Sequence, residues 1–118
     1  MKKKIESNLS FKESSISDLK IAIILAFYNG NKYIEEQIIS ILNQSHKNFV
    51  LFISDDYSSQ NISLENYKLS FSDKKKIKIF KRNKNLGYTL NFLNALYSLG
   101  NSYDYYAFSD QDDLWHKD

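Results

Sequence analysis

The feature that most constrains this chain is a continuous apolar run, rich in isoleucine, from Lys20 to Phe27. A strand with one face in water would alternate apolar and polar side chains, and this run does not alternate. It is therefore typical of a strand buried on both faces, in a parallel sheet covered by helices. Turn-forming residues at 28–31 follow it, so we expect the chain to leave the sheet there.

The remaining segments alternate between strand and helix patterns. Further strands are predicted at Phe49–Ser54, Ile77–Phe80 and Tyr105–Ser109. Helices are predicted at Lys32–Gln44, Ile62–Phe71 and Thr89–Leu99. The order βαβαβαβ, with connections long enough for crossover helices, predicts an α/β fold with a parallel sheet and flanking helices.

Two of the predicted helices have recognisable ends. Asn31 is a suitable N-cap for the first helix. In the last helix, Leu90, Leu93 and Tyr97 fall on one side, and Gly100 is expected to stop it.

Polar residues follow three of the four predicted strands. Tyr28 and Asn29 come after the first, Asp55 and Asp56 after the second, and residues 110–113 after the fourth. The carboxyl ends of parallel strands meet at one edge of a sheet, where such folds bind their ligands. We therefore expect a single site at this edge.

Three carboxylates lie within four positions near the end of the chain. Asp110 and Asp112 point to the same side of an extended backbone, and Asp113 follows at once. Their mutual repulsion favours a bound cation, and carboxylate oxygens suit Mg²⁺ or Mn²⁺. Such a cluster can hold a metal-bound diphosphate. The alternative is that Asp112 or Asp113 only caps a helix beginning at Leu114.

Composition removes several other classes. The chain has no cysteine and two histidines, which excludes disulfides and thiolate metal sites and argues against zinc. No apolar run is long enough to span a bilayer, and the basic start lacks the apolar segment of a signal peptide, so we expect a cytoplasmic location. The basic run at 74–84 is interpreted as a solvated face or an anion-attracting rim, not a nucleic-acid site.

Five blocks in order resemble the family-2 glycosyltransferases, from about Lys20 to the last residue. They are Ile23–Gly30, Ile38–Ser45, Phe52–Ser58, Asn85–Gly87 and Phe108–Trp115. The final block is most similar to bacterial rhamnosyltransferase-like members that build surface polysaccharides. The resemblance implies the nucleotide-binding half of a GT-A fold, which has a Rossmann-like sheet.

The resemblance also implies roles for individual residues. Phe27, Tyr28 and Asn29 would form the turn against the nucleobase, Asp56 would bind the base, Asp55 would support that loop, Asn85 and Gly87 would line the pocket, and Asp110 would contact the ribose. Asp112 and Asp113 would hold Mg²⁺ or Mn²⁺ on the diphosphate. Purely structural alternatives stay open: Phe27 as core packing, Asp55 as a turn or cap residue, Asn85–Gly87 as a turn, and Trp115 as a packing anchor.

Three departures from the family pattern matter. Ala26 stands where many relatives have proline, and Tyr57 stands where a small residue is common. The family's catalytic base follows the Asp-x-Asp motif, and only Leu114–Asp118 follow it here, so no catalytic residue is assigned. We therefore expect a polar arm at 1–19 and a donor-binding half at 20–118, truncated after the motif, with an exposed sheet edge that promotes self-association.

The implied activity is inverting, metal-dependent transfer of a sugar from a dTDP- or UDP-linked donor to a glycan acceptor. A location at the inner face of the membrane would suit that role. Two alternatives come from other classes. One is a non-catalytic remnant or interaction module with the same fold. The other is a receiver-like signalling domain, which would need an acidic pair after the first strand.

Overall fold

The computed structural model describes residues 18–111, 114 and 115. Its strands are β1 (Ile21–Phe27), β2 (Phe49–Asp55), β3 (Ile77–Lys81) and β4 (Tyr105–Asp110). Its helices are α2 (Ile34–Leu42), α3 (Phe71–Lys75) and α4 (Tyr88–Leu99), and a short 3₁₀ turn, η2, spans Leu64–Asn66. Most of the predicted arm at 1–19 lies outside the described residues, as do Asp112 and Asp113.

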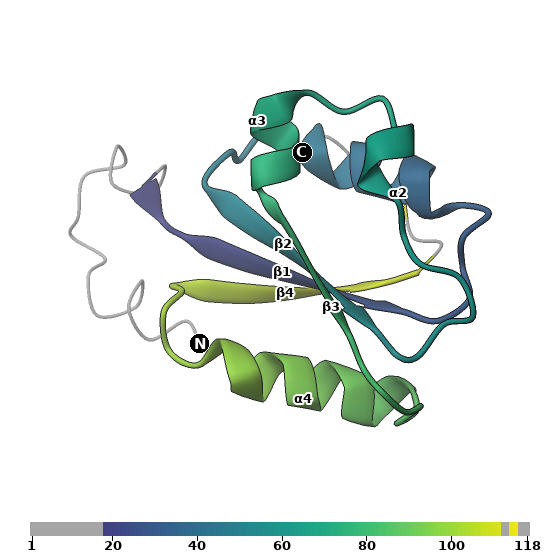
Figure 1. Ribbon diagram of the computed structural model, residues 1–118. Helices are drawn as coiled ribbons and strands as arrows, with labels where there is room; N and C mark the ends of the chain where they lie inside the picture. Colours follow the sequence, from purple (N-terminus) through teal and green to yellow (C-terminus); the bar gives the residue numbers. More distant parts are fainter. Residues whose placement is uncertain (1–17, 112–113, 116–118) are drawn as a thin grey trace.

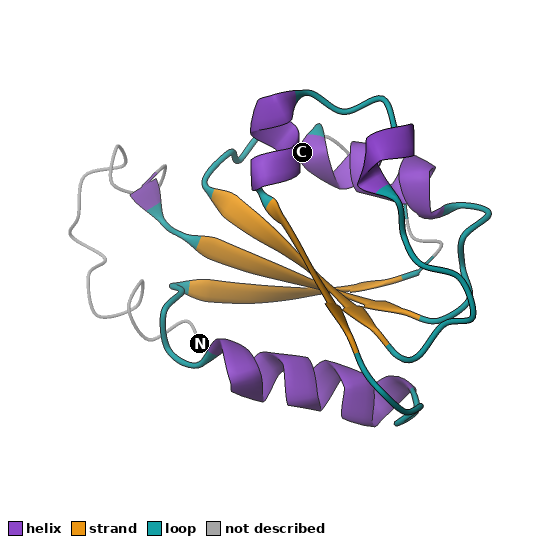
Figure 2. Cartoon of the chain, viewed as in Figure 1, coloured by secondary structure: helices purple, strands orange, loops and turns teal. Residues whose placement is uncertain are grey.

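The four strands form one parallel sheet in the order β3-β2-β1-β4 (Figure 1). Helix α4 lies along one face of this sheet, and α2 and α3 lie on the other (Figure 2). The predicted α/β fold with a parallel sheet and flanking helices is therefore confirmed. Edge positions in the described sheet belong to β3 and β4.

Strand β1 is central, between β2 and β4, and its side chains alternate between two cores. Ile23, Leu25 and Phe27 pack in the core on the α2 face. Ile24 and Ala26 pack in the smaller core under α4. Alternate side chains of a strand point to opposite faces of the sheet. Because helices cover both faces here, the side chains on each face must be apolar, which explains the unbroken apolar run.

Helix α2 is shorter than predicted. Its inner face packs in the core, where Ile34 and Ile38 are buried. The predicted cap at Asn31 is wrong: the N-cap residue is Tyr33, and it makes no side-chain capping bond. Residues 31–33 instead form a turn, so the helix starts later.

The predicted helix at Ile62–Phe71 is wrong. In its place the chain makes only the short η2 turn, and α3 begins at the far end of this range. Tyr67 and Leu69, two positions apart, pack against the α2-side core from a non-helical segment. Ser70 then starts α3 by accepting the Asp73 N–H at 3.1 Å. Tyr67 and Leu69 are thus partly buried at a spacing of two and do not form a helical face.

Helix α4 turns away from the sheet the side that carries Leu90, Leu93 and Tyr97. The exposed fractions are 56% for Leu90, 53% for Leu93 and 89% for Tyr97. Asn91, Phe92 and Ala95 are buried against the sheet instead. Asn91 faces inward because it bonds Ser54 of β2 and Arg82, the residue that follows β3. The predicted stop at Gly100 is confirmed by its left-handed φ of 65°.

None of the helices that the structure describes is long and apolar enough to cross a membrane.

Candidate functional site

The segments that follow the strands meet at one edge of the sheet. Phe27 of β1 pairs in register with Asp55 of β2, and Ala26 pairs with Asp110 of β4. The polar clusters predicted after β1, β2 and β4 therefore lie on three adjacent strands. Parallel pairing brings them together.

The turns after β1 and β2 are bonded to each other. The Asn29 N–H donates to Ser58 Oγ at 2.8 Å, and Asn29 Oδ1 accepts the Ser59 N–H at 2.9 Å. The Asp56 N–H donates to the Phe27 carbonyl at 2.8 Å. Asn29 has a φ of 51°, a left-handed conformation that asparagine tolerates better than most residues. Asn29 thus joins the two turns through both its backbone and its side chain.

The two aromatic residues at the end of β1 have different environments. Phe27 is buried in the core on the α2 face, which is the packing role left open by the sequence. Tyr28 is 46% exposed at the sheet edge. Tyr28 is therefore the aromatic side chain that is available to a ligand at this turn.

Asp55 stabilises its own turn. Its side chain is buried, and Oδ1 accepts the Ser58 N–H at 2.9 Å. This is the turn role that the sequence left open for Asp55. Tyr57, inside the turn, has a left-handed φ of 72°, a conformation that costs energy for a tyrosine.

Asp56 holds the segment that precedes α4. Its carboxylate is 2% exposed, and its two oxygens accept one N–H each: Leu86 to Oδ1 at 2.7 Å and Gly87 to Oδ2 at 2.8 Å. The Asn85 side-chain amide donates to the Asp56 carbonyl at 3.1 Å. Gly87 has a φ of 89°, which favours glycine. The structure thus brings together three residues that the sequence placed in the nucleotide pocket.

Arg82, at the end of β3, was not predicted as part of the site. It is 8% exposed, and its guanidinium donates to Asn91 Oδ1 at 2.8 Å, Asn94 Oδ1 at 2.8 Å and Ser54 Oγ at 3.0 Å. Burial lowers the pKa of Arg82, and the negative charge of Asp56 opposes that shift. A buried cation therefore lies close enough to Asp56 to interact with its charge.

The sequence interpretation of Arg82 as part of a solvated basic run is wrong. It is the only arginine of the chain, in a run whose other cations are lysines. Arginine presents several fixed donors and is preferred over lysine where a cation must be buried and bonded repeatedly. A single arginine in a run of lysines was therefore the sequence signal for a buried cation.

The end of β4 is held by two glutamines. Gln37 of α2 donates to Ser109 Oγ at 3.1 Å and to the Asp110 carbonyl. Gln111 Oε1 accepts the Tyr28 N–H at 2.6 Å. Neither glutamine was predicted as part of the site, although a glutamine on the inner face of an amphipathic helix is a sign of a buried polar contact. Asp110 is exposed at this position.

The predicted metal ligands cannot be placed, because Asp112 and Asp113 lie outside the described residues. Within residues 18–111, 114 and 115, no group of three or more histidine, aspartate and glutamate side chains is close enough to hold a metal. Of the predicted carboxylate cluster, Asp110 alone is described. The metal site stays a prediction.

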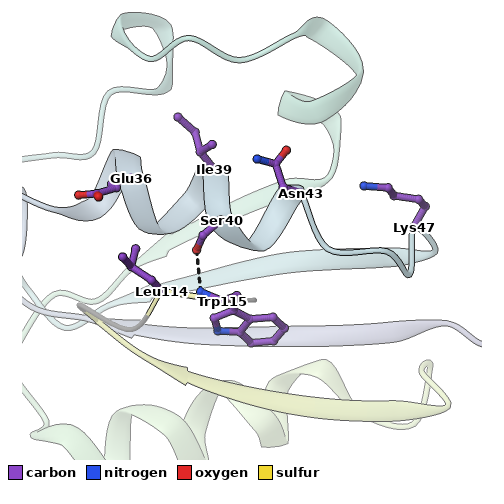
Figure 3. Close-up of a pocket in the computed structure, with 7 residues that line it drawn as sticks. All are labelled: Glu36, Ile39, Ser40, Asn43, Lys47, Leu114 and Trp115. Atoms are coloured by element: carbon purple, nitrogen blue, oxygen red, sulfur yellow. Dashed lines mark hydrogen bonds between the residues drawn. The ribbon is translucent and has the colours of Figure 1, made fainter. Parts of the chain in front are cut away.

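A separate groove of about 730 Å³ lies between α2 and the end of the chain (Figure 3). Its lining residues are Glu36, Ile39, Ser40, Asn43, Lys47, Leu114 and Trp115. The Trp115 N–H donates to Ser40 Oγ at 3.0 Å, and its indole N–H donates to Ser109 Oγ at 3.1 Å. Trp115 therefore anchors the chain after the acidic segment, as its packing alternative suggested. Among the residues that the structure describes, none that was predicted to bind nucleotide lines this groove.

A family model and several known proteins are similar to this chain. The family model described as Glycosyl transferase family 2 matches residues 22–118. The dTDP-rhamnosyl transferase RfbG of Shigella flexneri is 40% identical over 97 residues, which are 80% of this chain and 33% of that protein. Uncharacterized glycosyltransferase RC0461 of Rickettsia conorii is 39% identical over 104 residues, which are 87% of this chain and 16% of that protein. The chain thus spans a third or less of the length of these relatives.

Among solved structures, the crystal structure of S. aureus TarS resembles this chain with a TM-score of 0.64 and 25% sequence identity. The match covers 81% of this chain and 17% of TarS. The parallel sheet and its helices therefore resemble part of the GT-A fold of TarS.

Proposed function

Because this chain belongs to glycosyl transferase family 2, we propose that residues 20–118 bind the nucleotide-diphosphate part of a sugar donor. The proposed donor is dTDP- or UDP-linked, and the wider reaction builds surface polysaccharide. The observation that supports it most is the set of hydrogen bonds between the segments that follow the strands. Asn29 bonds Ser58, and Asp56 bonds the loop before α4.

In this proposal the nucleobase lies against Tyr28, whose side chain is exposed beside these turns. Asn29 and Asp55 shape the pocket through their turn bonds, and Asn85 and Gly87 line it. Asp56 orients the base. Each carboxylate oxygen has two lone pairs. Both oxygens can therefore keep their backbone N–H donors while one of them also accepts a hydrogen bond from a base.

Asp110 would contact the ribose, and Asp112 and Asp113 would hold a divalent metal on the diphosphate. The available donors are carboxylate oxygens, which fit Mg²⁺ or Mn²⁺. When bound, such an ion stabilises the negative charge that develops on the departing nucleoside diphosphate. The part of Gln37 is to fix the backbone carbonyl of Asp110, from which this acidic segment extends.

For the described residues we propose donor binding without sugar transfer. The chain spans 33% of RfbG and 16% of RC0461, and transfer also needs an acceptor site and a base to deprotonate the acceptor hydroxyl. The inverting outcome, the glycan acceptor and a rhamnosyl donor are further parts of the proposal, suggested by the family and by the name of RfbG. Single-turnover sugar transfer by the purified chain would contradict donor binding alone.

Two further proposals concern the surroundings of the chain. We propose a cytoplasmic location, at the inner membrane face, supported by the Lys2–Lys4 run, since anionic lipids attract lysine clusters. We also propose weak self-association through β4, which pairs with β1 on one side and forms an edge of the described sheet. Analytical ultracentrifugation over a range of protein concentrations tests the latter.

Isothermal titration of the 118-residue chain with dTDP and UDP, with and without Mn²⁺, tests donor binding. The wild type is expected to bind one of them more tightly with Mn²⁺, and Asp112→Ala is expected to lose that gain. Asp73→Asn is the matched control and is expected to keep the gain in affinity. Asp73 lies in α3, which directly precedes β3, and therefore at the amino ends of the strands, away from the site.

No binding of either nucleotide would refute the proposal and favour the non-catalytic remnant. The family assignment leaves the receiver-like alternative without support, and β1 is followed by Tyr28 and Asn29, where that fold needs an acidic pair.

A further inference from the structure

We propose that Gln111 is a positioning residue that ties the acidic segment after β4 to the turn after β1. We also propose that residue 30 is glycine to leave room for the Gln111 side chain. The inference rests on the proposed donor binding, and it names the side chain that holds the two halves of that site in register.

The first observation is the bond between the two segments. Gln111 Oε1 accepts the Tyr28 N–H at 2.6 Å, across 83 positions of sequence. Gln111 lies between Asp110 and Asp112, the two residues of the Asp-x-Asp motif. Its side chain therefore fixes the backbone from which the motif extends, relative to the turn that carries Tyr28.

The second observation is steric and comes from the other segment. A Cβ atom added at Gly30 would lie 3.1 Å from both Cδ and Oε1 of Gln111, and 3.2 Å from Cε1 of Phe27. These separations are shorter than an ordinary carbon contact. Gly30 does not have a positive φ, so its backbone conformation does not require glycine. A Cβ atom at this position would instead require the Gln111 and Phe27 side chains to shift by a few tenths of an ångström.

The third observation is that the segment is held on both sides of positions 112 and 113. Before them, Gln37 donates to the Asp110 carbonyl and to Ser109 Oγ. After them, the Trp115 N–H donates to Ser40 Oγ (Figure 3). Gln37 and Trp115 both attach the segment to α2. Gln111 bonds the described start of this segment to the Tyr28 turn, and so it sets Asp110 relative to the aromatic side of the site.

Side chains that orient metal ligands without touching the metal typically change metal affinity or activity by 10- to 100-fold when they are removed. We therefore expect Gln111→Ala to reduce the gain in dTDP affinity on adding Mn²⁺ by about tenfold or more. Gly30→Ala leaves the charges of the acidic segment unchanged and is expected to reduce the same gain, because it displaces Gln111. Asn101→Ala removes an exposed amide near the start of β4, at the other end of the strand, and serves as the control.

The experiment combines titration with amide hydrogen exchange on the 118-residue chain. Loss of the bond is expected to speed exchange of the Tyr28 amide about fivefold in Gln111→Ala and in Gly30→Ala, as one net hydrogen bond implies. Gln111→Glu keeps an acceptor oxygen at the same reach and is expected to preserve Tyr28 protection. Gly30→Ala is expected to change Tyr28 exchange less in the Gln111→Ala background than in the wild type, because the clash with the Gln111 side chain is gone and only that with Phe27 is left.

Unchanged Tyr28 exchange in Gln111→Ala would overturn the inference. The inference would also be overturned if Mn²⁺ raised the dTDP affinity of Gln111→Ala as much as that of the wild type, provided that the wild type itself binds dTDP. A wild type that binds no nucleotide would instead refute the proposed donor binding, and the inference with it. Because the exchange data need no ligand, the two failures are distinguishable.

Discussion

Replacing Asp56 with asparagine tests how the loop before α4 is held. In the folded chain each carboxylate oxygen accepts a backbone N–H, from Leu86 at 2.7 Å and from Gly87 at 2.8 Å. An amide of nearly the same shape offers one acceptor oxygen, and its NH₂ group would face the second N–H. Asp56→Asn therefore removes one of the two bonds without leaving a cavity.

The size of the loss follows from those two bonds. A hydrogen bond to a charged group contributes about 1.5–3 kcal/mol, and that is lost at one oxygen. The bond at the other oxygen becomes neutral and weakens by about 1 kcal/mol. Relief from burying a charge offsets part of this, so we expect Asp56→Asn to lower the free energy of unfolding by about 2–3 kcal/mol. That is a large share of the roughly 5–15 kcal/mol typical of a folded domain.

Urea unfolding followed by circular dichroism measures this loss, with the slope m checked for a common two-state transition. Asp55→Asn is the matched control, since Asp55 is equally buried and adjacent, but the described bond of its side chain is one acceptor bond, to the Ser58 N–H. An asparagine oxygen can accept that N–H, so we expect Asp55→Asn to cost less than about 1 kcal/mol. Equal losses in the two variants, or a loss below about 1 kcal/mol for Asp56→Asn, would refute the reasoning.

Three further predictions concern backbone strain and pH. Gly87→Ala is expected to lower the free energy of unfolding by about 1–3 kcal/mol through strain alone, because φ is 89° and no atom lies within 4 Å of the added Cβ; an unchanged urea midpoint would contradict this. Tyr57→Gly is expected to raise the same free energy by up to about 1 kcal/mol, since it removes a left-handed tyrosine at some cost in unfolded-chain entropy; a lower urea midpoint would argue against it. Burial, and then the charge of Glu35, raise the pKa of Tyr67, so its contribution to stability is complete below a pH of about 10 and is lost as the pH rises through the folded-state pKa. Tyr67→Phe should therefore flatten the alkaline fall in thermal stability, and an equally steep fall in both proteins would count against it.

The parallel sheet and the edge that carries the site followed from local sequence patterns. A buried central strand needs apolar side chains on both faces, and β1 has them from Ala22 to Phe27. Polar residues directly after such strands must lie at the carboxyl edge, which is where Asn29, Asp55 and Asp56 were found. These features depend on chain order and on side-chain periodicity, and both can be read directly.

Other features depended on contacts between distant segments. The apolar residues near Tyr67 have a composition that fits a helix, but they pack at a spacing of two once the α2-side core is formed. Asn91 lies on the side of α4 that faces the sheet, because it bonds Arg82 and Ser54 there. Neither choice can be made from a helical wheel, because each depends on the partner that the helix or segment meets.

Local sequence patterns predict the order of strands and helices, the central position of β1, and the strand ends at which polar residues gather. The partners of those polar groups depend on the folded chain: Asp56 bonds the loop before α4, the buried Arg82 bonds Ser54, and Gln111 bonds Tyr28. Hydrophobic periodicity is a property of residues that are neighbours in the chain. A hydrogen bond between residues 83 positions apart exists only after the sheet has brought them to the same edge.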